Sequence, residues 1–140
     1  MFAPSREEAR RFFFDAWGKY RRGELLQGLE QTAVTIILLH PEYHALLDDP
    51  QRNMTRDFTP EGGTLNPFLH LSLHLAVEEQ LSIDQPGGIR ARYETLAQKS
   101  GEHAAKHVVL DCLGETIWEA QRTGTAPDEA AYLECIARKV

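Results

Sequence analysis

The interval between apolar residues is the feature that most constrains the fold of this 140-residue chain. Near the N-terminus, apolar residues recur at steps of three and four, at Ala9, Phe12, Phe13, Ala16, Trp17 and Tyr20. This interval is the period of an α-helix with one buried face, and no segment alternates apolar and polar residues as a half-buried strand does. The pattern therefore predicts an all-α fold with essentially no sheet.

Capping residues, prolines and glycines mark where the predicted helices begin and end. Ser5 and Glu8 form a capping box, Pro41 ends one helix, and Asn66-Pro67 starts another. These signals predict six helices at about residues 5–20, 25–39, 66–83, 89–99, 102–122 and 128–138, with a short helical segment at 41–47. Residues 48–66 are expected to form an irregular loop. We therefore expect a small single-domain helical bundle of five to six helices over residues 1–140.

The composition disfavours several classes of protein. Acidic residues outnumber basic ones by 21 to 15, and the net charge of −6 disfavours bulk binding to nucleic-acid phosphates. The apolar runs are shorter than the roughly 20 residues of a membrane helix, and the first residues lack the apolar run of a signal peptide. Two cysteines, Cys112 and Cys135, are too few for a disulfide scaffold and are expected to be small buried thiols. A cytoplasmic location is the resulting expectation.

Histidine spacing is the strongest functional signal in the sequence. All six histidines fall into pairs four residues apart, namely His40 with His44, His70 with His74, and His103 with His107. Residues four apart on a helix lie one turn apart on the same face, so both imidazoles of a pair can reach one ion. On a helical projection, the pairs in the 66–83 and 102–122 helices lie in line with apolar residues and therefore face the core.

Carboxylates accompany two of the three pairs. Glu78 follows His74 by four residues, and Asp111 follows His107 by four. Neutral imidazole is a good ligand for zinc, iron, copper and nickel and a poor one for magnesium or calcium. The sequence therefore predicts a site for one or two transition metals, zinc or iron first, with ligands drawn from His40, His44, His70, His74, His103, His107, Glu78 and Asp111. These residues do not by themselves assign a reaction.

A metal-free interaction module is the alternative. In it, the histidines are buried structural residues bonded to carboxylates and carbonyl groups, and the loop at 48–66 docks a protein partner. A hydrolase that uses His and Asp pairs without metal is weaker, because no nucleophile stands beside these pairs. Pro41 lies between His40 and His44, so these two can also belong to different elements, with His40 capping the next turn.

Four segments resemble a known bacterial family. They are residues 40–47 (HPEYHALL), 66–75 (NPFLHLSLHL), 80–86 (QLSIDQP) and 112–115 (CLGE). The chain looks like a member of the family of domains of unknown function numbered 1841, over its whole length. The resemblance implies a small, cytosolic helical protein, and it brings no activity, cofactor or catalytic residue with it.

Overall fold

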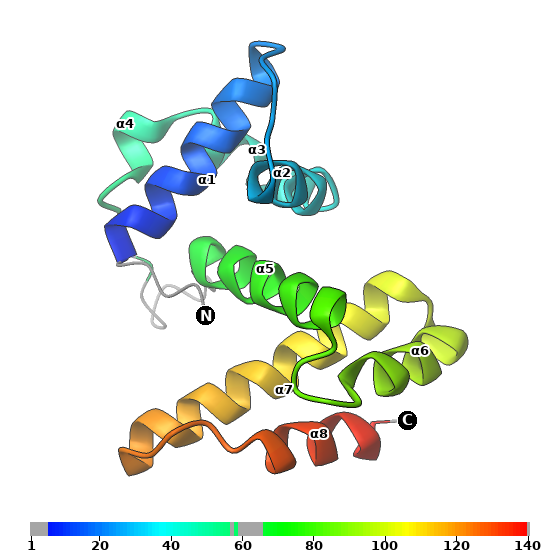
Figure 1. Ribbon diagram of the computed structural model, residues 1–140. Coiled ribbons are helices and arrows are strands. Elements are labelled where there is room, and N and C mark those ends of the chain that lie inside the picture. The colour runs from blue at the N-terminus through cyan, green and yellow to red at the C-terminus, as the bar shows by residue number, and fades with distance from the viewer. Residues whose placement is uncertain (1–5, 57, 59–65, 140) are drawn as a thin grey trace. The chain divides into compact units, whose positions relative to one another are not determined.

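The computed structural model describes residues 6–56, 58 and 66–139 (Figure 1). Over these residues the chain forms helices and turns and no strand, which confirms the predicted all-α class. The helices are α1 (Arg6–Arg21), α2 (Leu29–Leu38), the 3-10 turn η1 (Pro41–Tyr43), α3 (His44–Leu47), α4 (Pro50–Asn53), α5 (Pro67–Ile83), α6 (Ile89–Ser100), α7 (Glu102–Thr123) and α8 (Glu129–Arg138). None of the described helices has both the length and the apolar character to cross a membrane.

The predicted number of five to six helices is wrong, because the described residues contain eight α-helices and one 3-10 turn. The additional elements are short and lie between α2 and α5. α4 is a single turn within the predicted loop, and the Asp49 carboxylate caps it by accepting from the backbone N–H of Arg52 at 3.2 Å. Most of the rest of that loop, residues 57 and 59–65, lies outside the described residues, as does the predicted cap Ser5.

The long helices begin and end close to their predicted positions. Asn66 caps α5, because its Oδ1 accepts from the backbone N–H of Phe68 at 2.9 Å. Asp128 caps α8 in the same way, through the N–H of Ala131 at 3.1 Å. α2 starts at Leu29, whereas the sequence predicts a start at about residue 25. The reason is that Gly28, just before it, has a φ of 55°, which lies outside the range of a right-handed α-helix.

The chain divides into two compact units, Met1–Leu75 and Ala76–Val140. The boundary falls within α5, and the prediction of one domain stays a prediction. In the N-terminal unit, α1 packs against α2 and α3 (Figure 1). Its core contains Phe13, Phe14, Ala16, Trp17, Ala33, Val34, Ile36, Ile37, Leu47, Phe68, Leu71 and Leu75.

A buried arginine links α1 to the end of α4 and to the residues that follow it. Arg10 is 1 % exposed, and its Nη1 donates to the carbonyl oxygens of Asn53, Met54 and Arg56 at 3.3, 3.0 and 2.7 Å. The guanidinium also lies 4.8 Å from the centre of the Phe68 ring. Arg10 therefore provides donors for backbone acceptors in a segment that has little regular structure of its own.

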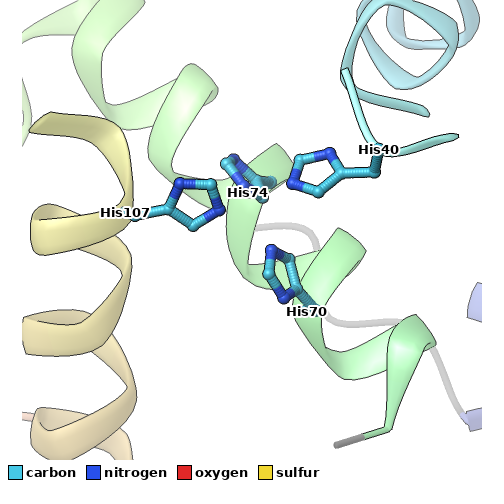
Figure 2. A group of neighbouring side chains, drawn as sticks. All are labelled: His40, His70, His74 and His107. Carbon is cyan, nitrogen blue, oxygen red and sulfur yellow. The ribbon is translucent and has the colours of Figure 1, made fainter. Parts of the chain in front are cut away.

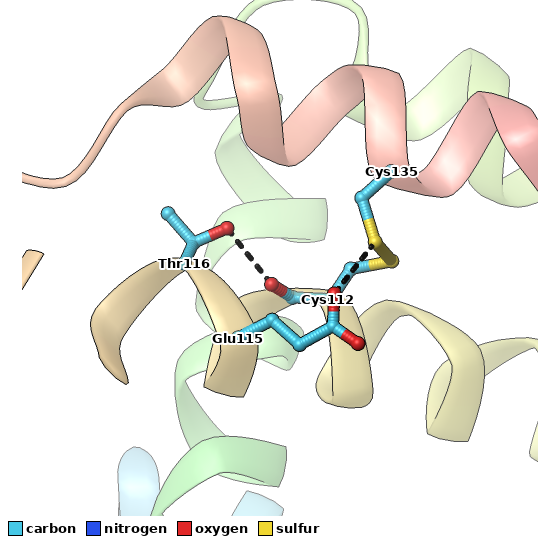
Figure 3. Close-up of a disulfide and its surroundings, with 4 residues drawn as sticks. All are labelled: Cys112, Glu115, Thr116 and Cys135. Carbon is cyan, nitrogen blue, oxygen red and sulfur yellow. Dashed lines mark hydrogen bonds between the residues drawn. A yellow bond between two sulfur atoms is a disulfide. The ribbon is translucent and has the colours of Figure 1, made fainter. Parts of the chain in front are cut away.

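In the C-terminal unit, α6, α7 and α8 pack on one another (Figure 1). The Tyr132 hydroxyl on α8 donates to the Gln80 side chain at 2.6 Å, which connects α8 to the end of α5. Cys112 on α7 and Cys135 on α8 form a disulfide, with their Cα atoms 5.8 Å apart (Figure 3). Both cysteines are buried as predicted, but the prediction of separate thiols is wrong.

The first prediction concerns Arg10. Replacing it in Arg10→Met should lower the free energy of unfolding by roughly 2–4 kcal/mol, because three carbonyl groups lose a charged donor. Arg11→Met is the matched control, since Arg11 makes an exposed ion pair with Glu7 and should cost less than about 1 kcal/mol. Urea denaturation of both variants measures the difference, and equal losses would show that Arg10 has no special role.

The second prediction concerns the disulfide. Reduction should lower the free energy of unfolding by about 3 kcal/mol, because the bond joins residues 23 positions apart and restricts the unfolded chain. The double variant Cys112→Ala, Cys135→Ala should denature at the same urea concentration with and without reductant. If wild-type stability is unchanged when thiol titration finds both cysteines reduced, the disulfide does not stabilise the fold.

Candidate metal centre

Three histidines of the N-terminal unit lie together. The ring centres of His40 and His70 are 4.9 Å apart, those of His40 and His74 are 4.8 Å apart, and those of His70 and His74 are 5.0 Å apart. One ring nitrogen of each histidine lies within 4.8 Å of those of the other two (Figure 2). Three nitrogens bound to one zinc at about 2.0–2.1 Å lie roughly 3.3–3.6 Å apart, so a closure of at most about 1.5 Å would bring the three rings onto one ion.

The end of α2 positions His40. Pro41 disfavours helical geometry at the residue before it, and His40 has φ −128° and ψ 69°, outside the helical region. The His40 backbone N–H still donates to Ile37 at 2.9 Å, and its Nδ1 lies 2.8 Å from the carbonyl oxygen of Ile36. Because a carbonyl oxygen only accepts, Nδ1 carries the proton of the neutral ring, and Nε2 keeps the lone pair that a metal needs.

The first turns of α5 position the other two rings. Asn66 caps this helix and Pro67 occupies its first position, so His70 and His74 follow in regular helical geometry. Their rings are stacked, with 27° between their planes, as side chains one turn apart on the same face can be. The predicted pairing of these two histidines is therefore present on one helix face.

The surroundings of the cluster are largely shielded from water. His40 and His74 are each 2 % exposed, and His70 is half-buried. Tyr43 covers part of the cluster, since its ring lies 5.7 Å from the rings of both His40 and His70. Burial raises the pKa of the Tyr43 hydroxyl above its usual value, so the phenol stays protonated at neutral pH.

His44 does not join the cluster. Its Nε2 donates to the carbonyl oxygen of Ile37 at 2.8 Å, and its ring packs 4.6 Å from that of Trp17. His40 and His44 therefore bond to neighbouring carbonyl groups in the last turn of α2, where the intrahelical partners run out. The structure thus separates the first predicted pair, and His44 acts as a cap for α2.

The third pair lies on α7 in the C-terminal unit. The His107 Nδ1 donates to the carbonyl oxygen of His103 at 3.2 Å, which leaves its Nε2 with a lone pair. The two rings meet edge to face with centres 4.4 Å apart. His103 is exposed and His107 is half-buried, so the two members of this pair have different surroundings.

The two predicted carboxylates also belong to the C-terminal unit. Glu78 forms an ion pair with Lys106, with Oε1 2.6 Å from Nζ, and both residues line a pocket of about 340 Å³. Burial by itself lowers the pKa of Lys106, but the hydrogen bond and charge of Glu78 outweigh it, so the pKa is raised and the ammonium stays charged. Asp111 is exposed on α7.

Two features of the site have no clear signal in the sequence. The carbonyl groups of Ile36 and Ile37 that orient His40 and His44 belong to the backbone, and no residue type identifies them. The position of Tyr43 beside two of the clustered rings follows from the 3-10 turn η1, which the sequence predicts only as helical. The proline between the two histidines was the available sign that this pair would separate.

Comparison with known proteins identifies a family. No curated protein matches the chain, and no solved structure does. The family described as Domain of unknown function (DUF1841) matches residues 5–138. The match covers almost the whole length, including the segments that carry all six histidines. The chain therefore belongs to the DUF1841 family.

Proposed function

We propose that this protein binds one transition-metal ion through His40, His70 and His74. The observation that carries the proposal is the approach of three imidazole nitrogens to within 4.8 Å of one another in the N-terminal unit. A buried imidazole needs partners for both of its nitrogens, and a metal satisfies one nitrogen of each ring at once. Imidazole ligands favour zinc or iron over magnesium and calcium, so zinc and iron are the first metals to test.

His107 is the proposed fourth ligand. Four-coordinate tetrahedral zinc is usual in structural sites, and three histidines leave one position to fill. His107 is half-buried, whereas its pair partner His103 is exposed, and His44 lies outside the cluster with its ring against that of Trp17. This role for His107 rests on the histidine spacing in the sequence.

A metal-free interaction module remains the competing function. It requires that the imidazole nitrogens of the cluster be satisfied by hydrogen bonds within the protein alone. The bond from His40 Nδ1 to the carbonyl oxygen of Ile36 is of this kind. The two functions differ in one measurable respect, since only the metal protein should contain a stoichiometric transition metal.

The third prediction therefore concerns metal content and stability. Protein purified without a metal-affinity tag should contain one transition-metal ion per chain by elemental analysis. EDTA should lower the melting temperature at neutral pH, and added Zn²⁺ or Fe²⁺ should restore it, because a ligand at a hundredfold excess over Kd stabilises the fold by about 2.7 kcal/mol. If neither EDTA nor added metal changes the melting temperature, and elemental analysis finds no transition metal, the interaction module is favoured.

The fourth prediction assigns the ligands. His40→Ala and His74→Ala should each abolish the metal-dependent rise in melting temperature, because each removes a proposed ligand. His103→Ala is the matched control, since this exposed histidine should leave the rise unchanged. His107→Ala should weaken zinc binding at least tenfold, measured by competition with a chelator. An unchanged affinity in His107→Ala would limit the site to three histidines.

The pH dependence of metal binding follows from the same chemistry. Protons and metal compete for the same imidazole nitrogens, so zinc affinity should fall as the pH is lowered through the range where histidine protonates. The stability that the metal adds is therefore present at neutral pH and lost in acid. Zinc titrations at several pH values measure this loss, and a pH-independent affinity would exclude histidine ligands.

A further inference from the structure

Among the described residues, the potential metal ligands of the candidate metal centre are all histidines, which are neutral when they bind a metal. We propose that the metal at this centre binds a small anion from solution as an additional ligand, an inference that rests on the proposed metal site. The proposal holds for three or for four histidine ligands, because neutral imidazole contributes no charge in either case. A divalent ion together with these neutral ligands therefore has a net charge of +2.

Charge that is shielded from water requires compensation. His40 and His74 are each 2 % exposed, so an ion bound between them loses most of its contact with water. An isolated charge in such surroundings is costly unless an opposite charge accompanies it. In many protein metal sites, a carboxylate ligand provides that opposite charge.

No carboxylate takes that role in the described part of the chain. Over the described residues, the buried polar or charged side chains are Arg10, His40, Asn53 and His74, none of which is acidic. The potential metal ligands that lie together in these residues are all histidines. Of the two predicted carboxylates, Glu78 pairs with Lys106 at 2.6 Å, and Asp111 is exposed on α7. An anion from solution would provide the compensation that these described residues do not.

The half-buried side of the cluster gives a small anion access. His70 is partly exposed, unlike the other two rings, and Tyr43 beside it is also half-buried. The Tyr43 ring lies 5.7 Å from both His40 and His70, so it limits the space on this side. These surroundings favour an anion of a few atoms over a bulky one.

Cobalt substitution tests the inference on the intact chain. Co²⁺ should replace the native metal and give a visible absorption spectrum, and sodium azide at constant ionic strength should change that spectrum saturably. An unchanged spectrum in protein that holds one Co²⁺ per chain would overturn the anion proposal and leave the metal site standing. Failure of the chain to bind Co²⁺, Zn²⁺ or Fe²⁺ would overturn the metal function itself.

A matched pair of variants tests whether charge compensation is the reason that the metal binds an anion. His70→Glu places a negative ligand at the half-buried position, and His70→Gln places a neutral one of the same size. Azide should bind the cobalt form of the Glu variant at least tenfold more weakly than that of the Gln variant. Circular dichroism checks that both variants are folded. Equal azide affinities in the two cobalt-loaded variants would show that the anion does not compensate charge, and would overturn the proposal.

Discussion

The hydrogen bond from His40 Nδ1 to the carbonyl oxygen of Ile36 is the contact on which the candidate metal centre depends. It adds a donor to the last turn of α2, where carbonyl groups lose their intrahelical partners. It also fixes the ring plane of His40 and leaves the lone pair on Nε2. This one contact of 2.8 Å thus adds a donor at the end of the helix and also orients the His40 ring.

The long helices could be predicted from the sequence because their signals are local. The Asn66-Pro67 start of α5 and the Asp128 cap of α8 act through backbone groups within three residues. The short elements between α2 and α5 could not, because α4 is a single turn in a segment whose carbonyl groups bond to a side chain of α1. Arg10 is distant in sequence from those carbonyl groups, so no local pattern identifies the contact.

The candidate site was predictable to the extent that helical spacing determines it. His70 and His74 share a face of α5 because nothing interrupts their helix, whereas Pro41 directs His40 and His44 to different partners. Spacing alone does not distinguish His40 from His44, although His40 lies in the cluster and His44 packs on Trp17. The disulfide was missed because a count of two cysteines does not reveal that α8 folds back along α7 and brings them together.

That disulfide has a consequence for the connection between α7 and α8. Residues 121–131 are all exposed, and they include the turn at Gly124 and the start of α8. Exposed turns of this kind are preferred sites of proteolytic nicking. Cys112 and Cys135 lie on either side of this segment, so a single cut within it leaves the two pieces covalently joined. In an oxidising environment, a nicked chain keeps α8 attached, and the fragments can separate only after the bond is reduced.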